Sequence, residues 1–98
     1  MSNTHFEASV RAQDNVAIID LRGEINGQSE AALNEAYAQA TRQNPAKVLL
    51  NFSGVDYINS TGIALIVGLL AQSRKNGRSL LTCGLSEHYV EIFKITRL

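Results

Sequence analysis

Polar and apolar residues alternate over the first part of the chain, which is the pattern of half-buried β-strands. Two such segments span residues 6–11 and 16–21, and the second is rich in β-branched side chains. Asp14 and Asn15 lie between the two segments and favour a turn. The sequence therefore predicts two strands that pair as a hairpin.

A loop and an amphipathic helix are predicted after the hairpin. Gly23 and Gly27 bracket the segment Glu24-Ile25-Asn26, and glycines so placed favour a loop. Over residues 29–42, apolar side chains recur at the i, i+3, i+4 and i+7 positions of one helical face: Leu33, Ala36, Tyr37 and Ala40. Pro45 cannot continue this helix, so the helix is expected to end before it.

The middle of the chain contains an apolar strand followed by an apolar helix. Residues 47–52 are nearly all apolar, which predicts a strand covered on both faces. Residues 60–75 carry a broad apolar stripe typical of a helix, and Asn76-Gly77 ends it. Gly68 within that helix costs about 1 kcal/mol relative to alanine, so we expect close packing against the sheet to require it.

A fourth strand over residues 79–83 and a third helix over residues 86–94 complete the predicted elements. The order ββαβαβα, with short connections, predicts one small α/β domain over residues 1–98. In this domain helices are layered against a mixed β-sheet. Right-handed crossovers make the last strands parallel.

The composition argues against several classes of function. Nine basic and nine acidic side chains cancel, so the chain lacks the basic surface typical of nucleic-acid binders. The longest apolar run, residues 62–71, is about half of a membrane span, so we expect no direct membrane insertion. The N-terminus has no signal-peptide pattern, and the single cysteine cannot form an internal disulfide. Both features lead us to expect a cytoplasmic protein.

The candidate chemistry lies where the central strand gives way to the long helix, at Asn59-Ser60-Thr61-Gly62. The first turn of a helix leaves backbone N–H groups without partners. These donors and the helix dipole favour an anion, such as a phosphate on Ser60. Asn, Ser and Thr are also the preferred N-cap residues, so a structural role as helix cap is an open alternative. The two roles are compatible.

Other reactive side chains give weaker signals. His5 and His88 have no partners at the spacing of metal ligands, so we expect surface or packing roles and no metal. No Walker motif or GxGxxG pattern is present, so we expect no nucleotide cofactor. Cys83 lies within the fourth predicted strand, and we expect a small buried residue rather than a reactive thiol.

Four segments, in this order, resemble the STAS domain family, which includes the bacterial anti-sigma factor antagonists. The loop Val55–Gly62 carries the main resemblance, because Asn59-Ser60-Thr61-Gly62 is similar to the family's Asp-Ser-Ser/Thr-Gly. The other three segments are Gly23–Asn26, the central strand Val48–Phe52, and Asn76-Gly77 followed by Leu80–Gly84. Each match is weak alone, but the ordered set covers most of the chain and is specific.

The resemblance implies a protein-interaction switch rather than an enzyme. The serine phosphorylated in the family corresponds to Ser60, with Thr61 as a neighbouring hydroxyl. In such systems the anti-sigma factor is the ATP-dependent serine kinase, and a serine phosphatase restores the unphosphorylated form. That form binds the kinase and frees the sigma factor. The implied partner-binding residues are Asn26, Asn59, Ser60, Thr61, Gly62 and Ile63. We expect the free protein to be a monomer.

The chain departs from the family pattern in two places. The family has aspartates where this chain has Asn26 and Asn59, and an amide keeps the shape and the capping oxygen but loses the charge. The family also usually continues into another strand and a last helix, whereas this chain stops at Leu98. We therefore expect either a short version of the domain or a trimmed one.

Two other functions are open at this stage. A STAS scaffold subunit of a signalling assembly or a membrane transport complex would need no phosphorylatable serine. A small serine hydrolase could use Ser60 as its nucleophile, but it would need a base, and the sequence places neither histidine to supply one.

Overall fold

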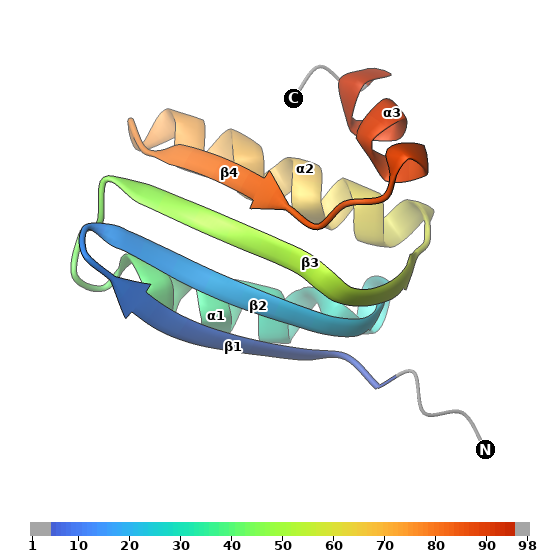
Figure 1. Ribbon diagram of the computed structural model, residues 1–98, viewed down its shortest axis with the longest axis horizontal. Helices are drawn as coiled ribbons and strands as arrows, with labels where there is room; N and C mark the ends of the chain where they lie inside the picture. Colours follow the sequence, from blue (N-terminus) through green and yellow to red (C-terminus); the bar gives the residue numbers. More distant parts are fainter. Residues whose placement is uncertain (1–4, 96–98) are drawn as a thin grey trace.

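The computed structural model describes residues 5–95 and contains the elements in the predicted order (Figure 1). The strands are β1 (Glu7–Gln13), β2 (Val16–Ile25), β3 (Lys47–Ile58) and β4 (Ser79–Cys83). The helices are α1 (Glu30–Thr41), α2 (Ser60–Lys75) and α3 (Glu87–Ile95). A short 3-10 helix, η1 (Gly27–Ser29), precedes α1.

The strands form one four-stranded sheet in the order β1-β2-β3-β4. β1 pairs antiparallel with β2, which confirms the predicted hairpin. β2 pairs parallel with β3, and β3 pairs parallel with β4, as right-handed crossovers require. Figure 1 shows α1 and α2 behind the sheet, and α3 beyond the end of β4. The fold class predicted from the sequence is thus confirmed.

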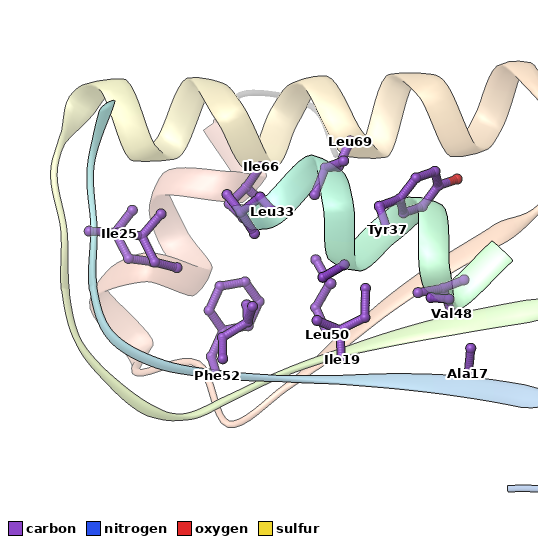
Figure 2. Packing of buried hydrophobic residues seen from close by; sticks show 14 of the residues in the cluster. Ala17, Ile19, Ile25, Leu33, Tyr37, Val48, Leu50, Phe52, Ile66 and Leu69 are labelled. Carbon is purple, nitrogen blue, oxygen red and sulfur yellow. The ribbon is translucent and has the colours of Figure 1, made fainter. Parts of the chain in front are cut away.

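The helices cover only one face of the sheet, so the prediction that the central strand is covered on both faces is wrong. Along the first half of β3, buried Val48, Leu50 and Phe52 alternate with half-buried Leu49 and Asn51. Figure 2 shows the buried side chains between the sheet and the helices. The opposite side of the sheet, to which Leu49 and Asn51 belong, is called the open face below.

Two strands continue beyond their predicted ends. β2 runs to Ile25 and β3 runs to Ile58, so the loop predicted across Glu24-Ile25-Asn26 is largely strand. Gly23 lies inside β2 with a φ of +94°, close to an irregularity in the pairing with β3. A Cβ at Gly23 would collide with the backbone of His5, so the glycine permits close approach rather than a loop. The extensions carry both strand ends to the start of α2.

Two residues predicted in the interior lie at the surface. Gly68 is exposed, and a Cβ there would meet nothing within 4 Å, so sheet packing does not explain this glycine. Cys83 is also exposed, because it pairs in register with Asn51 on the open face. Its Sγ lies 3.4 Å from Asn51 Oδ1. Successive residues of a strand face opposite sides of the sheet, so the register of β4 decides that Cys83 lies on the open face.

A polar network crosses the open face between β1, β2 and β3. Arg11 Nε donates to Asp20 Oδ2 at 2.7 Å, and Asn51 Nδ2 donates to Asp20 Oδ1 at 2.8 Å. The bond from Arg11 and then the bond from Asn51 lower the pKa of Asp20, because both favour its charged form. The network therefore links the stability of the fold to pH.

We expect Asp20 to stabilise the fold above its ordinary pKa of about 3.9, and to lose this effect at lower pH. Its pKa is lower in the folded state, so the unfolded chain binds the proton first as the pH falls, and protonation favours unfolding. Thermal midpoints measured from about pH 6 to about pH 2 should fall less steeply for Asp20→Asn than for the wild type. Equal slopes would show that Asp20 contributes nothing to the acid dependence.

Candidate functional site

Asn59 caps the N-terminus of α2. Its backbone is extended, with φ −85° and ψ 179°, and its Oδ1 accepts a hydrogen bond from the Gly62 N–H at 2.8 Å. Its carbonyl accepts a bond from the Ile63 N–H at 2.9 Å. The cap role that the sequence left open among neighbouring residues therefore belongs to Asn59. The amide at this position retains the capping oxygen.

Ser60 is the first residue of α2, and both Ser60 and Thr61 are exposed. Within residues 5–95, neither hydroxyl takes part in a hydrogen bond. The Ser60 hydroxyl is therefore accessible from solvent and does not have to break an internal bond to react. It also lies beside the positive end of the α2 dipole.

Asn26 forms the corresponding turn at the end of β2. Its Oδ1 accepts from the Gln28 N–H at 2.9 Å, and its own N–H donates to Ser29 Oγ at 3.0 Å. This reciprocal arrangement is a capping box for η1. Asn26 Nδ2 also donates to Glu24 Oε2 at 3.3 Å. Asn26 is half-buried, and these hydrogen bonds give it a structural role in the turn.

Backbone contacts hold the two asparagine turns together. The Asn59 N–H donates to the Ile25 carbonyl at 3.1 Å. Gly62 is buried against the same carbonyl, and a Cβ at Gly62 would collide with it. A Cβ at Gly27 would lie 3.5 Å from Thr61 Cγ2, which is ordinary contact. Because β2 and β3 are parallel neighbours, their C-terminal ends deliver both turns to the same edge of the sheet.

The structure brings all six predicted partner-binding residues together, with different exposure. Ser60 and Thr61 are exposed, Asn26, Asn59 and Ile63 are half-buried, and Gly62 is buried. Gly62 therefore shapes the surface by allowing close packing and does not present a side chain to a partner. The remaining five residues form what we call the α2 N-terminal surface: Asn26, Asn59, Ser60, Thr61 and Ile63.

Tyr89, which lies in the third predicted helix, supports this surface from α3. Its Oη accepts from the Ile58 N–H at 2.8 Å and donates to the Ile58 carbonyl at 3.3 Å. Ile58 immediately precedes Asn59, so α3 anchors the end of β3 next to the α2 cap. A residue-type pattern cannot reveal this role, because the bond depends on backbone groups 31 residues away.

The described residues contain neither a cluster of metal-binding side chains nor a membrane-spanning helix. No group of histidine, cysteine, aspartate or glutamate side chains within residues 5–95 could hold a metal ion. Between the same limits, none of the helices has both the length and the hydropathy that a membrane crossing requires. His5 and His88 are both exposed, and the ring of His88 packs edge-on against Tyr89 with centroids 5.0 Å apart.

Comparison with known sequences settles the family. Residues 7–98 match the STAS domain family. The chain belongs to the STAS domain family. This STAS domain is 30% identical over 94 residues to the anti-sigma-B factor antagonist of Bacillus subtilis (strain 168), covering 96% of this chain and 85% of that protein. It is 28% identical over 86 residues to the anti-sigma-B factor antagonist of Staphylococcus aureus (strain NCTC 8325 / PS 47), covering 88% and 80% respectively.

Solved structures share the fold of this STAS domain. An anti-sigma factor antagonist from Mycobacterium paratuberculosis has a TM-score of 0.75 at 17% identity, over 97% of this chain and 82% of that one. The Bacillus cell fate determinant SpoIIAA in its phosphorylated form has a TM-score of 0.72 at 17% identity, over 96% and 85%. The two sequence relatives are anti-sigma-B factor antagonists rather than enzymes, in agreement with the prediction that this chain is not an enzyme.

Proposed function

We propose that this STAS domain is an anti-sigma factor antagonist that is controlled by reversible phosphorylation of Ser60. In its unphosphorylated form it binds an anti-sigma factor with serine kinase activity through the α2 N-terminal surface. A serine phosphatase regenerates that form. The observation that carries the proposal is the exposed Ser60 hydroxyl at the start of α2, without a hydrogen-bond partner in residues 5–95.

The local structure favours a phosphate at this position. Asn59 Oδ1 already occupies the Gly62 N–H, while the earlier N–H groups of the first turn remain directed towards the helix start. These donors and the helix dipole stabilise an anion near Ser60. Asn26 and Asn59 place amides rather than carboxylates beside it, so neither residue repels the phosphate.

A phosphate on Ser60 would change binding more than it changes the fold. It adds about −1.5 to −2 charges to a chain whose nine basic and nine acidic side chains cancel. The group would point to solvent, so the packing between the sheet and the helices would remain intact. A partner surface with carboxylates at this contact would then be repelled, and one phosphate would separate the two proteins.

Asn26 and Asn59 set the conditions for the kinase. In place of the two family carboxylates, the kinase meets two uncharged amides that are held by backbone bonds. A kinase for this chain must therefore orient the Ser60 hydroxyl without a flanking negative charge from these positions. Because such a kinase depends on ATP, we also propose a cytoplasmic location for the switch.

The alternative functions receive less support from the site. A scaffold subunit would not require an accessible hydroxyl at the helix N-terminus. For a hydrolase, Ser60 would need a hydrogen-bonded base, and within residues 5–95 the Ser60 hydroxyl has no bond to a histidine or to any other side chain. The binding switch is therefore the function that the geometry supports best.

The direct test is phosphopeptide mapping of the full chain recovered from its native cells together with its bound proteins. We expect the phosphate on Ser60 and a co-purifying serine kinase. The Thr61→Ala variant should still be phosphorylated, because Thr61 is only the neighbouring hydroxyl, whereas Ser60→Ala should not. Phosphate found on Thr61 alone, or its persistence in Ser60→Ala, would overturn the proposed site.

A further inference from the structure

The position of the Ser60 hydroxyl depends on the two residues that precede it, Ile58 and Asn59. The Asn59 N–H donates to the Ile25 carbonyl of β2 at 3.1 Å, and the Asn59 side chain caps α2. Ile58 is the last residue of β3, and its side chain is buried. Because successive residues of a strand bond to opposite sides, the backbone N–H and C=O groups of Ile58 point away from β2.

A tyrosine of α3 bonds to these two backbone groups of Ile58. The pairing of β3 with β4 ends where Asn51 meets Cys83, and Ile58 lies beyond that point along β3. Figure 1 shows α3 close to the end of the sheet at which α2 begins. From there the Tyr89 Oη accepts from the Ile58 N–H at 2.8 Å and donates to the Ile58 carbonyl at 3.3 Å. A side chain thus provides the bonds that β4 provides to the first half of β3.

The phenol group of Tyr89 is suited to this double contact. Its oxygen has one hydrogen to donate and lone pairs to accept, so a single atom satisfies both backbone groups of Ile58. Phenylalanine would fill the same space and satisfy neither group. The ring of Tyr89 packs against the hydrophobic core and lies edge-on to the ring of His88. The core therefore holds the ring, and the ring holds the hydroxyl against the strand.

We propose that Tyr89 is a positioning residue for the phosphorylation of Ser60. Tyr89 holds the backbone of Ile58, and Ile58 leads directly into the Asn59 cap. The cap in turn sets the direction in which the Ser60 hydroxyl leaves the helix. Tyr89 acts only through the backbone, because it does not bond to the serine itself. The inference rests on the proposed function, since it concerns the rate at which the kinase modifies this serine.

Phosphoryl transfer is sensitive to the position of the attacking oxygen. The Ser60 oxygen forms a bond to the γ-phosphorus of ATP, the bond from that phosphorus to ADP breaks, and the serine proton passes to a base of the kinase. The attacking and leaving oxygens lie roughly in line, and a misplacement of about 1 Å can lower such a rate about 100-fold. A looser backbone before Ser60 therefore reduces the time that its hydroxyl spends in the reactive orientation.

Removal of the Tyr89 hydroxyl would loosen this part of the backbone. The contact between Tyr89 and Ile58 is partly buried. Without the hydroxyl, the N–H and C=O groups of Ile58 can bond to water only if the end of β3 moves, because unpaired buried groups are costly. The α2 N-terminal surface would keep all of its side chains. The expected defect is therefore one of orientation and not of contact area.

Amide hydrogen exchange on the full chain tests the contact without the kinase. In Tyr89→Phe, the Ile58 N–H should exchange at least about tenfold faster than in the wild type, and the Asn59 and Gly62 amides should also exchange faster. Tyr37→Phe is the matched control. The Tyr37 hydroxyl is buried and has no hydrogen-bond partner within residues 5–95, so its loss should leave these rates unchanged. Unchanged exchange of Ile58 in Tyr89→Phe would overturn the proposal.

The kinetics of Ser60 phosphorylation by the co-purifying serine kinase test the consequence. In Tyr89→Phe, kcat should fall about tenfold, while KM for the STAS domain should change by less than about twofold. Val48→Ala separates this effect from lost stability. Val48 is buried near the opposite end of β3, so its truncation should lower the thermal midpoint and leave both constants unchanged. An unchanged kcat in Tyr89→Phe, or a change confined to KM, would overturn the proposal.

These experiments separate the positioning role from the proposed function. If Ser60 is phosphorylated in the wild type and equally fast in Tyr89→Phe, the switch is correct and the positioning role of Tyr89 is wrong. If the kinase does not phosphorylate Ser60 in the wild type, the proposed function is wrong and the positioning role is wrong with it.

Discussion

Replacing Gly62 with alanine should lower the thermal midpoint of unfolding by roughly 10 °C or more. Gly62 is buried, and the added Cβ would collide with the Ile25 carbonyl, which is backbone and cannot rotate away. Forcing a methyl group into a packed contact costs about 3 kcal/mol, and the better helix propensity of alanine returns at most about 1 kcal/mol. Differential scanning calorimetry would measure the shift.

Gly68 provides the matched control, because it is a glycine in the same helix with opposite surroundings. A Cβ at Gly68 meets nothing within 4 Å, so Gly68→Ala should keep the propensity gain and raise the midpoint by about 4–8 °C. The two substitutions are chemically identical, but they should shift the thermal midpoint in opposite directions. A small effect at Gly62 would mean that β2 and α2 can move apart, and that the contact does not hold the two asparagine turns together.

The second large effect is expected for the affinity between the protein and its anti-sigma factor. Ser60→Glu places a negative charge where the proposed phosphate would lie, and it should weaken binding at least about tenfold relative to Ser60→Ala. Ser60→Ala should bind like the unphosphorylated wild type and should not respond to kinase and ATP. Isothermal titration calorimetry with the purified anti-sigma factor would give both affinities.

The stability of the same variants separates a charge effect at the contact from a loss of fold. An acidic side chain in the first turn of α2 interacts favourably with the helix dipole, so Ser60→Glu should keep or slightly raise the thermal midpoint. Ser9→Glu, on the exposed side of β1, should leave the affinity unchanged. Equal binding by the Glu and Ala variants of Ser60 would contradict the switch.

Much of the candidate site was predictable from local sequence, because its chemistry depends on residues that are adjacent in the chain. Asn59, Ser60 and Gly62 share one turn of α2, and their cap geometry follows from residue type and spacing. The same local argument could not choose Asn59 as the cap over its neighbours. That choice depends on the Ile25 carbonyl, which receives the Asn59 N–H across the sheet.

The ends of the strands were poorly predicted for a related reason. Gly23 and Gly27 favour a loop when read locally, yet β2 continues through Gly23 because β3 pairs with it and His5 approaches its backbone. Pairing partners that are distant in sequence overrode the local preference. As a consequence, Asn26 and Asn59 lie together at one edge of the sheet. Their separation along the sequence could not have predicted this proximity.

The sequence by itself determined the number and order of the elements, the family, and the identity of the serine at the start of α2. These depend on periodicity and on short motifs, which are local properties of the chain. The tertiary structure alone decided which side of each element is covered. It placed all of the sheet packing of α1 and α2 on one face, and it left Cys83 and Gly68 exposed. Exposure of this kind depends on register and on the direction in which each helix crosses the sheet, and both are set by contacts between distant segments.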